Sequence, residues 1–225
     1  MSRIKALIMK DFFTARNSVK SLLISYTIFL FVLFMMKNYF QRLNDLPDNI
    51  LIIIAIILFV SMGLLFITTG FMRYIFQESA IGKEEIYFAY GYGVGELCFG
   101  KALFFTVLSL VIPYILVLLF FSGLLKTPFF LFNILLILPI LFLLISYLVI
   151  FLTWFTKLGT AVYFVMFFGV FFLISKVVKK IIKMKLKMNL TTIISIELGI
   201  ILILFIISYL ITKLIKKENL IEKLS

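Results

Sequence analysis

Long apolar runs limit what this chain can fold into more than any other feature. A helix needs about 20 apolar residues to cross the ~30 Å hydrocarbon core of a bilayer. A backbone exposed to lipid must also satisfy its own hydrogen bonds, as a helix does. We therefore predict an all-α integral membrane protein with six transmembrane helices in one domain over residues 1–225. The spans are expected at about residues 18–36, 50–72, 102–125, 129–152, 158–175 and 190–212.

The composition agrees with a lipid environment and excludes several kinds of chemistry. The chain is 64% hydrophobic and 14% charged, whereas a soluble domain has roughly 25% charged residues. It has no histidine, which excludes histidine-based acid–base catalysis, Ser-His triads and most zinc sites. Its single cysteine, Cys98, excludes an intrachain disulfide. These absences argue against an enzyme, and we expect no cofactor or metal in this chain.

Basic residues near the predicted span ends indicate the topology. By the positive-inside bias, the basic N-terminal arm and the lysine-rich tail predict that both termini are cytoplasmic in a multi-pass cell-membrane protein. Residues 1–19 place apolar side chains at helical spacing opposite basic ones, which is typical of a helix lying on the membrane surface. A plain extension of the first span is the alternative. The net charge of +12 is attributed to lysines and arginines near the span ends, which set the topology and attract anionic headgroups, so no nucleic-acid partner is expected. The lysine- and isoleucine-rich composition favours a bacterial source.

One basic loop conflicts with this topology, because it would lie outside the cell. Either the fifth span is not a full crossing or these lysines have a use outside. The loop can form an amphipathic helix that anchors on lipid, or it can gather or repel a charged cargo at the exit. Its lysines are Lys176, Lys179, Lys180, Lys183, Lys185 and Lys187.

Few polar or helix-breaking residues lie within the predicted spans. Glu197 and Asn133 are candidates for a translocation path, since polar groups in a membrane interior are costly. Alternatively, Glu197 is an interfacial acid neutralised by a lysine of the basic loop, and Asn133 makes an interhelical contact. Pro113 and Pro139 each remove a helical hydrogen bond, so they are candidate hinges, although prolines are common in membrane helices.

The loop between the second and third spans has the most definite pattern in the chain. Gly82 predicts a turn, and Lys83-Glu84-Glu85 open a short helix at the membrane surface, where early carboxylates suit the helix dipole. Tyr87, Phe88 and Tyr90 are expected to anchor this helix in the groove of a partner protein. The alternative is an interfacial loop whose aromatic rings lie at headgroup level.

This loop resembles that of the permease subunit of ABC-2 type exporters. In that family an acidic residue, a glycine, one or two acids, an apolar pair and a breaker precede a Gly-Lys at the next span. The matching residues, in order, are Glu78, Gly82, Glu84, Glu85, Ile86, Gly100 and Lys101. Gly91-Tyr92-Gly93 stands where the family usually has a proline, and LIMKDF, from Leu7 to Phe12, resembles the family's N-terminal elbow helix.

The resemblance implies that the loop is a coupling helix that docks on a separate cytoplasmic ATPase. The chain has no GxxxxGK[ST] phosphate loop, so MgATP is expected in that partner, present in two copies beside a second, identical or paralogous permease chain. The implied ATPase contacts are Glu78, Gly82, Lys83, Glu84, Glu85, Tyr87, Phe88 and Tyr90.

The function expected from these features is export of a hydrophobic or amphipathic cargo. A peptide is favoured, and a lipid or a drug is possible. Two other classes of transport protein remain open as alternatives. A substrate-capturing six-helix subunit of a vitamin importer needs a preformed pocket with converging polar groups. An ion-coupled secondary transporter needs paired intramembrane acids or broken helices in two related halves.

Overall fold

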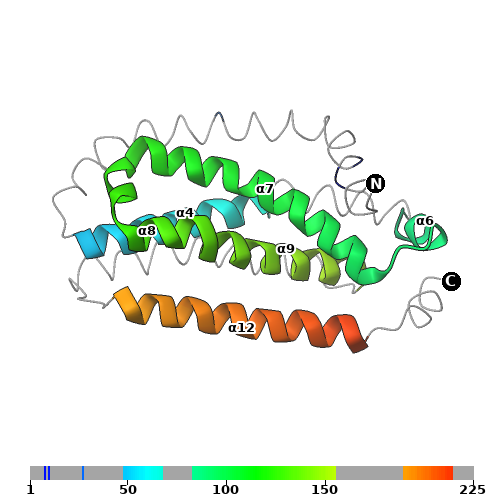
Figure 1. The fold of residues 1–225 in the computed structure, drawn as a ribbon. Coiled ribbons are helices and arrows are strands. Elements are labelled where there is room, and N and C mark those ends of the chain that lie inside the picture. The colour runs from blue at the N-terminus through cyan, green and yellow to red at the C-terminus, as the bar shows by residue number, and fades with distance from the viewer. Residues whose placement is uncertain are drawn as a thin grey trace.

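Helices make up the regular structure of the described part of the chain (Figure 1). The computed structural model describes residues 48–67, 83–155 and 190–214, together with Ile8, Lys10 and Thr27. Within these residues there is no strand, which confirms the all-α prediction. The elements are α4 (Asp48–Phe66), α6 (Lys83–Ala89), α7 (Val94–Phe120), the 3-10 turn η2 (Ser122–Lys126), α8 (Pro128–Phe132), the π-helical segment η3 (Asn133–Ile137), α9 (Leu138–Phe155) and α12 (Leu190–Leu214).

Three helices in the described ranges are long and apolar enough to cross a membrane. They are Val94–Phe120, Pro128–Trp154, in which α8, η3 and α9 follow one another, and Thr191–Lys213. A shorter apolar helix, Ile50–Leu64, lies within α4. These helices indicate a membrane-embedded protein. The span predicted at residues 18–36, apart from Thr27, and the span predicted at 158–175 lie outside the described residues. The surface helix at 1–19, apart from Ile8 and Lys10, and the basic loop lie outside them too.

The long helices run side by side, and one of them is antiparallel to the others (Figure 1). α4, α9 and α12 all run toward the end at which α6 lies, whereas α7 runs away from it. α7 packs along α9 and α4, and α12 packs on α9. Most of the side chains in the core between these helices are leucine, isoleucine or phenylalanine. Helices in lipid associate through close van der Waals packing of such side chains.

The centre of the core is built from aromatic rings. Phe59 of α4 lies 5.4 Å from Tyr114 of α7 and 6.2 Å from Phe142 of α9, measured between ring centroids. Phe59 and Phe142 are completely buried. The tilted and edge-on ring arrangements suit the aromatic quadrupole, so these contacts join α4, α7 and α9 into one unit.

α7 begins earlier than the sequence predicted. The span was expected from residue 102, but the helix starts at Val94 and includes Gly95 and Gly100. Gly93 is the N-cap, and its backbone N–H donates to the Glu96 carboxylate across 3.1 Å. This bond satisfies a backbone donor at the helix start, as in half of a capping box, and so the helix can begin directly after the glycine-rich turn.

Candidate functional site

The turn after α6 is closed by a glycine in a left-handed conformation. Gly91 has φ +79°, which a residue with a side chain adopts at a cost. Its N–H donates to the Phe88 carbonyl across 2.9 Å, and the Tyr92 N–H donates to the Tyr87 carbonyl across 3.2 Å. This pair of bonds is a Schellman motif. A four-residue link, from Tyr90 to Gly93, thus ends α6 and caps α7 without the proline that the family usually has.

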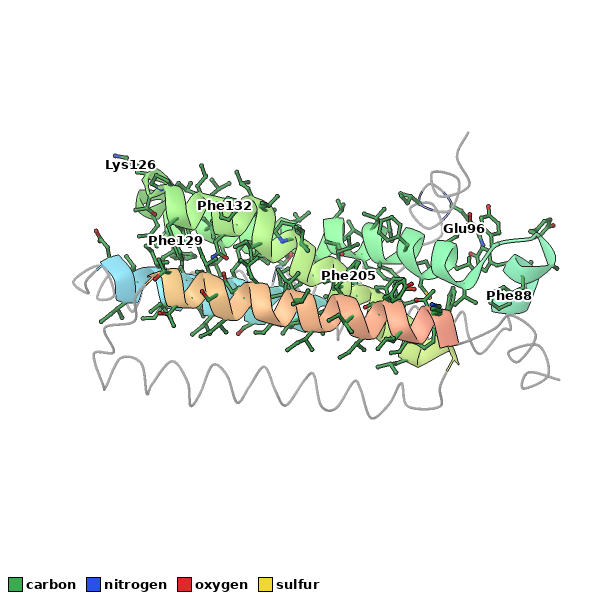
Figure 2. The ribbon with its side chains drawn as sticks, turned by 60° about the horizontal axis from the view of Figure 1, so that its bottom comes forward. Phe88, Glu96, Lys126, Phe129, Phe132 and Phe205 are labelled. Atoms are coloured by element: carbon green, nitrogen blue, oxygen red, sulfur yellow. The ribbon has the colours of Figure 1, made fainter. Side chains whose placement is uncertain are left out.

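One face of α6 is buried against the rest of the chain, and the opposite face is exposed. Tyr87 and Phe88 are only 4% and 6% exposed, whereas Ile86 and Tyr90 are 52% and 75% exposed. Phe88 is labelled in Figure 2, beyond the end of the long helices. Of the aromatic side chains predicted to contact an ATPase, Tyr87 and Phe88 therefore pack within this chain, and Tyr90 is available to a partner.

Tyr87 lies in a cluster of rings and lysines that joins α6 to α7 and α9. Its ring stacks on Trp154 of α9, with centroids 6.3 Å apart, and meets Tyr92 edge-on at 6.0 Å. The ammonium of Lys101, on α7, is 5.5 Å from the Tyr87 centroid and 5.2 Å from Trp154. Lys10 lies 4.1 Å above the Tyr87 ring and donates a hydrogen bond to its hydroxyl. We call Tyr87, Tyr92, Lys101 and Trp154 the helix-end cluster.

The side chain of Lys101 is completely buried in this cluster. A desolvated ammonium over aromatic faces gains about 2 kcal/mol or more from each good cation–π contact, which offsets part of the cost of burying the charge. Lys101 belongs to the Gly-Lys pair that carries the family resemblance, and here it holds α6 against the end of the bundle.

Replacing Tyr87 by alanine is expected to release α6 from the bundle. The variant loses a buried ring and its contacts with Trp154 and both lysines, so the loss of stability should be about 3–5 kcal/mol within this local unit. Hydrogen exchange of the α6 amides, followed by mass spectrometry, should become at least tenfold faster. Tyr90→Ala is the matched control, because Tyr90 is exposed and its removal should leave that exchange unchanged. Equal exchange in both variants would contradict the role given to the cluster.

Two predicted path residues, far apart in the sequence, meet inside the bundle. Asn133, the first residue of η3, donates a hydrogen bond from Nδ2 to Glu197 Oε2 of α12 across 2.7 Å. Asn133 is fully buried and Glu197 is 8% exposed. The Oδ1 atom of Asn133 is buried with no hydrogen-bond partner. We call these two residues the intramembrane polar pair. The lysines proposed as alternative partners of Glu197 lie outside the described residues.

The pair adjoins a break in helical hydrogen bonding that involves Pro139. In η3 the Leu138 N–H donates to the Asn133 carbonyl, five residues back. The next such bond would run from residue 139 to Ile134, but proline has no N–H. Tyr114 of α7 supplies the missing donor, since its hydroxyl lies 2.9 Å from the Ile134 carbonyl oxygen. π-helical segments are often found at functional sites.

Tyr114 is therefore a residue of this region that sequence reasoning missed. It directly follows Pro113, which lies buried in the interior of α7. Both candidate hinge prolines thus lie next to one interhelical bond, between Tyr114 and Ile134. The signal in the sequence was a tyrosine in an otherwise apolar span, but no local pattern indicates which carbonyl on another helix it meets.

The structure describes the remaining predicted residues only in part. Lys83, Glu84 and Glu85 form the first turn of α6, with side chains outside the description. Glu78, Gly82 and the six lysines of the basic loop lie outside the described residues. Comparison of the chain with protein-family models, with curated proteins and with solved structures finds no match.

Proposed function

We propose that this chain is the membrane-spanning permease subunit of an ATP-driven exporter of the ABC-2 type. It crosses the membrane six times, has an N-terminal elbow helix and keeps both termini in the cytoplasm. α6 acts as the coupling helix, which receives the movement of an ATPase. The cargo is hydrophobic or amphipathic; a peptide is favoured over a lipid or a drug.

The observation that carries the proposal is the attachment of α6. This short helix lies beyond the end of the long helices (Figure 1), and in the chain it follows α4 and precedes α7. Tyr87 binds it to α7 and α9 through Lys101 and Trp154. Ile86 and Tyr90 remain exposed. A helix held in this way passes a push on its outer face directly to two membrane helices.

The directions of the described helices support the six-span topology. α9 ends and α12 begins at opposite ends of the bundle, since the two helices run in the same direction (Figure 1). A six-span chain requires α9 and α12 to run in the same direction, because it has one crossing between them. α7 begins and α12 ends at the end where α6 lies (Figure 1), which supports placing α6 on the side that the basic termini predict to be cytoplasmic.

The proposal assigns ATP chemistry to a partner. Two copies of a cytoplasmic ATPase would bind MgATP and dock on α6 of two permease chains, identical or paralogous. The docking surface would consist of the exposed side chains Ile86 and Tyr90 and the acidic first turn at Glu84 and Glu85. Acidic residues at such a surface determine which partner binds and in which position, and they contribute less to the affinity itself.

Charge reversal in the first turn of α6 tests this proposal. We expect Glu84→Lys with Glu85→Lys to abolish co-purification of the ATPase and to lower cargo-stimulated ATP turnover at least tenfold, because like charges across an interface cost several kcal/mol. Lys126→Glu, at the opposite end of the bundle, is the control and should change neither (Figure 2). Unchanged association and turnover in the double variant would refute the coupling-helix assignment.

The intramembrane polar pair favours a second candidate, an ion-coupled secondary transporter. A buried carboxylate beside an unpartnered amide oxygen is an arrangement that can hold a proton or a cation. The two candidates differ in their energy source. Export from proteoliposomes driven by an ion gradient without ATP or ATPase would establish the second and exclude the first.

A further inference from the structure

A groove of about 750 Å³ lies between α9 and α12. α12 contributes Leu198, Leu202 and Phe205 at helical spacing, and α9 contributes Ile140, Leu143 and Leu144. The lining is almost entirely apolar over this length. Its volume is in the range of pockets that hold small ligands, roughly 300–1,000 Å³.

The groove is open to the surroundings of the bundle. Leu198, Leu202 and Phe205 are 51%, 60% and 59% exposed, so an occupant can enter from the side. Phe205 marks the middle of the α12 wall and is labelled in Figure 2. Since α12 is long and apolar enough to cross a membrane, we expect lipid chains to surround this opening.

The hydroxyl groups at one end of the groove are satisfied within the protein. Thr212 donates to the Ser208 carbonyl and Ser208 donates to the Leu204 carbonyl, each across 2.7 Å. Because Thr212 uses its only proton in this way, Tyr147 is the donor in the bond that joins the two hydroxyls. None of these three protons is left for a ligand, which favours a hydrocarbon occupant over a polar one.

The dimensions of the groove suit a lipid chain. From Leu198 to Thr212 the α12 wall measures roughly 21 Å at 1.5 Å per residue. The chains of one leaflet reach about half of a ~30 Å hydrocarbon core. The groove is therefore long enough for one acyl chain that begins at the membrane surface.

A positive charge lies where the headgroup of such a lipid would be. Lys213 is exposed in the last turn of α12, next to Thr212, and its ammonium is 5.8 Å from the ring centroid of Tyr209, which lines the groove. The carboxylate of Glu96, in the first turn of α7, accepts the Gly93 N–H. A lysine at a span end attracts anionic headgroups.

We propose that the α9–α12 groove binds an acyl chain of an anionic phospholipid of the surrounding bilayer, with its phosphate at Lys213. The lipid enters from the leaflet on the α6 side. It fills the space between α9 and α12, and so contributes to holding α12 on the bundle. This site requires only membrane embedding and is independent of the proposed ATPase partner.

A photo-crosslinking residue placed at Leu202 tests the site in the full-length chain. The protein is reconstituted in vesicles of equal parts phosphatidylglycerol and phosphatidylcholine, and lipid adducts are identified by mass spectrometry. We expect phosphatidylglycerol adducts to exceed phosphatidylcholine adducts about fivefold, the preference that one lysine near the surface provides. The same photo-crosslinking residue placed at Val111, which is exposed on α7 and does not line the groove, should give the two adducts in the ratio of the lipids in the vesicle.

A headgroup variant completes the test. Lys213→Gln should return the adduct ratio at Leu202 to the bulk value, whereas Lys126→Gln, at the opposite end, should preserve the preference (Figure 2). Equal ratios at Leu202 and Val111 would overturn the proposal. Crosslinks between two copies of the chain at Leu202 would also overturn it, because a second protein would then cover the groove.

Discussion

Gly63→Ala is expected to lower the thermal-denaturation midpoint of the detergent-solubilised protein. A Cβ at Gly63 of α4 would overlap the end of the Phe142 ring on α9. That ring is completely buried and packs against Phe59, so it has no open space into which to move. Overpacking of this kind costs typically 1–3 kcal/mol.

Gly199→Ala is the matched control for this prediction. A Cβ at Gly199 of α12 meets nothing within 4 Å, and alanine favours a helix by up to about 1 kcal/mol over glycine. The control should be as stable as the parent or slightly more stable. Phe142→Leu combined with Gly63→Ala should recover part of the loss, since it removes the atoms that clash. If Gly63→Ala alone were as stable as the parent, the close approach of α4 and α9 would be wrong.

Asn133→Leu is the second substitution that we expect to lower the stability of the protein strongly, because it removes the described hydrogen-bond partner of Glu197 inside the bundle. A buried polar group left without its partner costs about 1–3 kcal/mol. We expect Asn133→Leu alone to destabilise more than Asn133→Leu combined with Glu197→Leu, in which both polar groups are gone. Thermal denaturation of both single variants and the double variant gives the coupling energy between the two residues.

Ser195→Ala is the control for the polar pair. Ser195 is exposed on α12 and donates a hydrogen bond to the Thr191 carbonyl four residues back in the same helix, so its loss should change the denaturation midpoint little. Additive effects of the Asn133 and Glu197 substitutions would show that the pair contributes no coupling. A double variant less stable than either single variant would contradict the argument in the same way.

Hydropathy predicted the described long helices because the cost of an unsatisfied backbone in lipid depends only on local sequence. The runs predicted at 129–152 and 190–212 correspond to helices that span 128–155 and 190–214. The start of α7 was placed too late, since Gly91, Gly93 and Gly95 were interpreted as a break in the chain before the third span. The bond from the Gly93 N–H to Glu96 allows the helix to begin at Val94 and to include Gly95.

The sequence also indicated which polar residues inside the spans are unusual, but not which of them meet. Asn133 and Glu197 were both candidates, and their contact depends on how α12 rotates and slides against the π-helical segment. The bond from Tyr114 to Ile134 depends in turn on a carbonyl that Pro139 leaves without a donor. Such contacts join residues on different helices, so no local periodicity encodes them.

By itself, then, the sequence determined an all-helical, membrane-embedded chain and a short acidic helix between two apolar helices. Only the tertiary structure decided that Tyr87 and Phe88 turn inward while Ile86 and Tyr90 remain exposed. It also decided that α9 and α12 leave an apolar groove between them. The physical reason is that burial in lipid depends on composition, whereas packing depends on which side chains meet across helices.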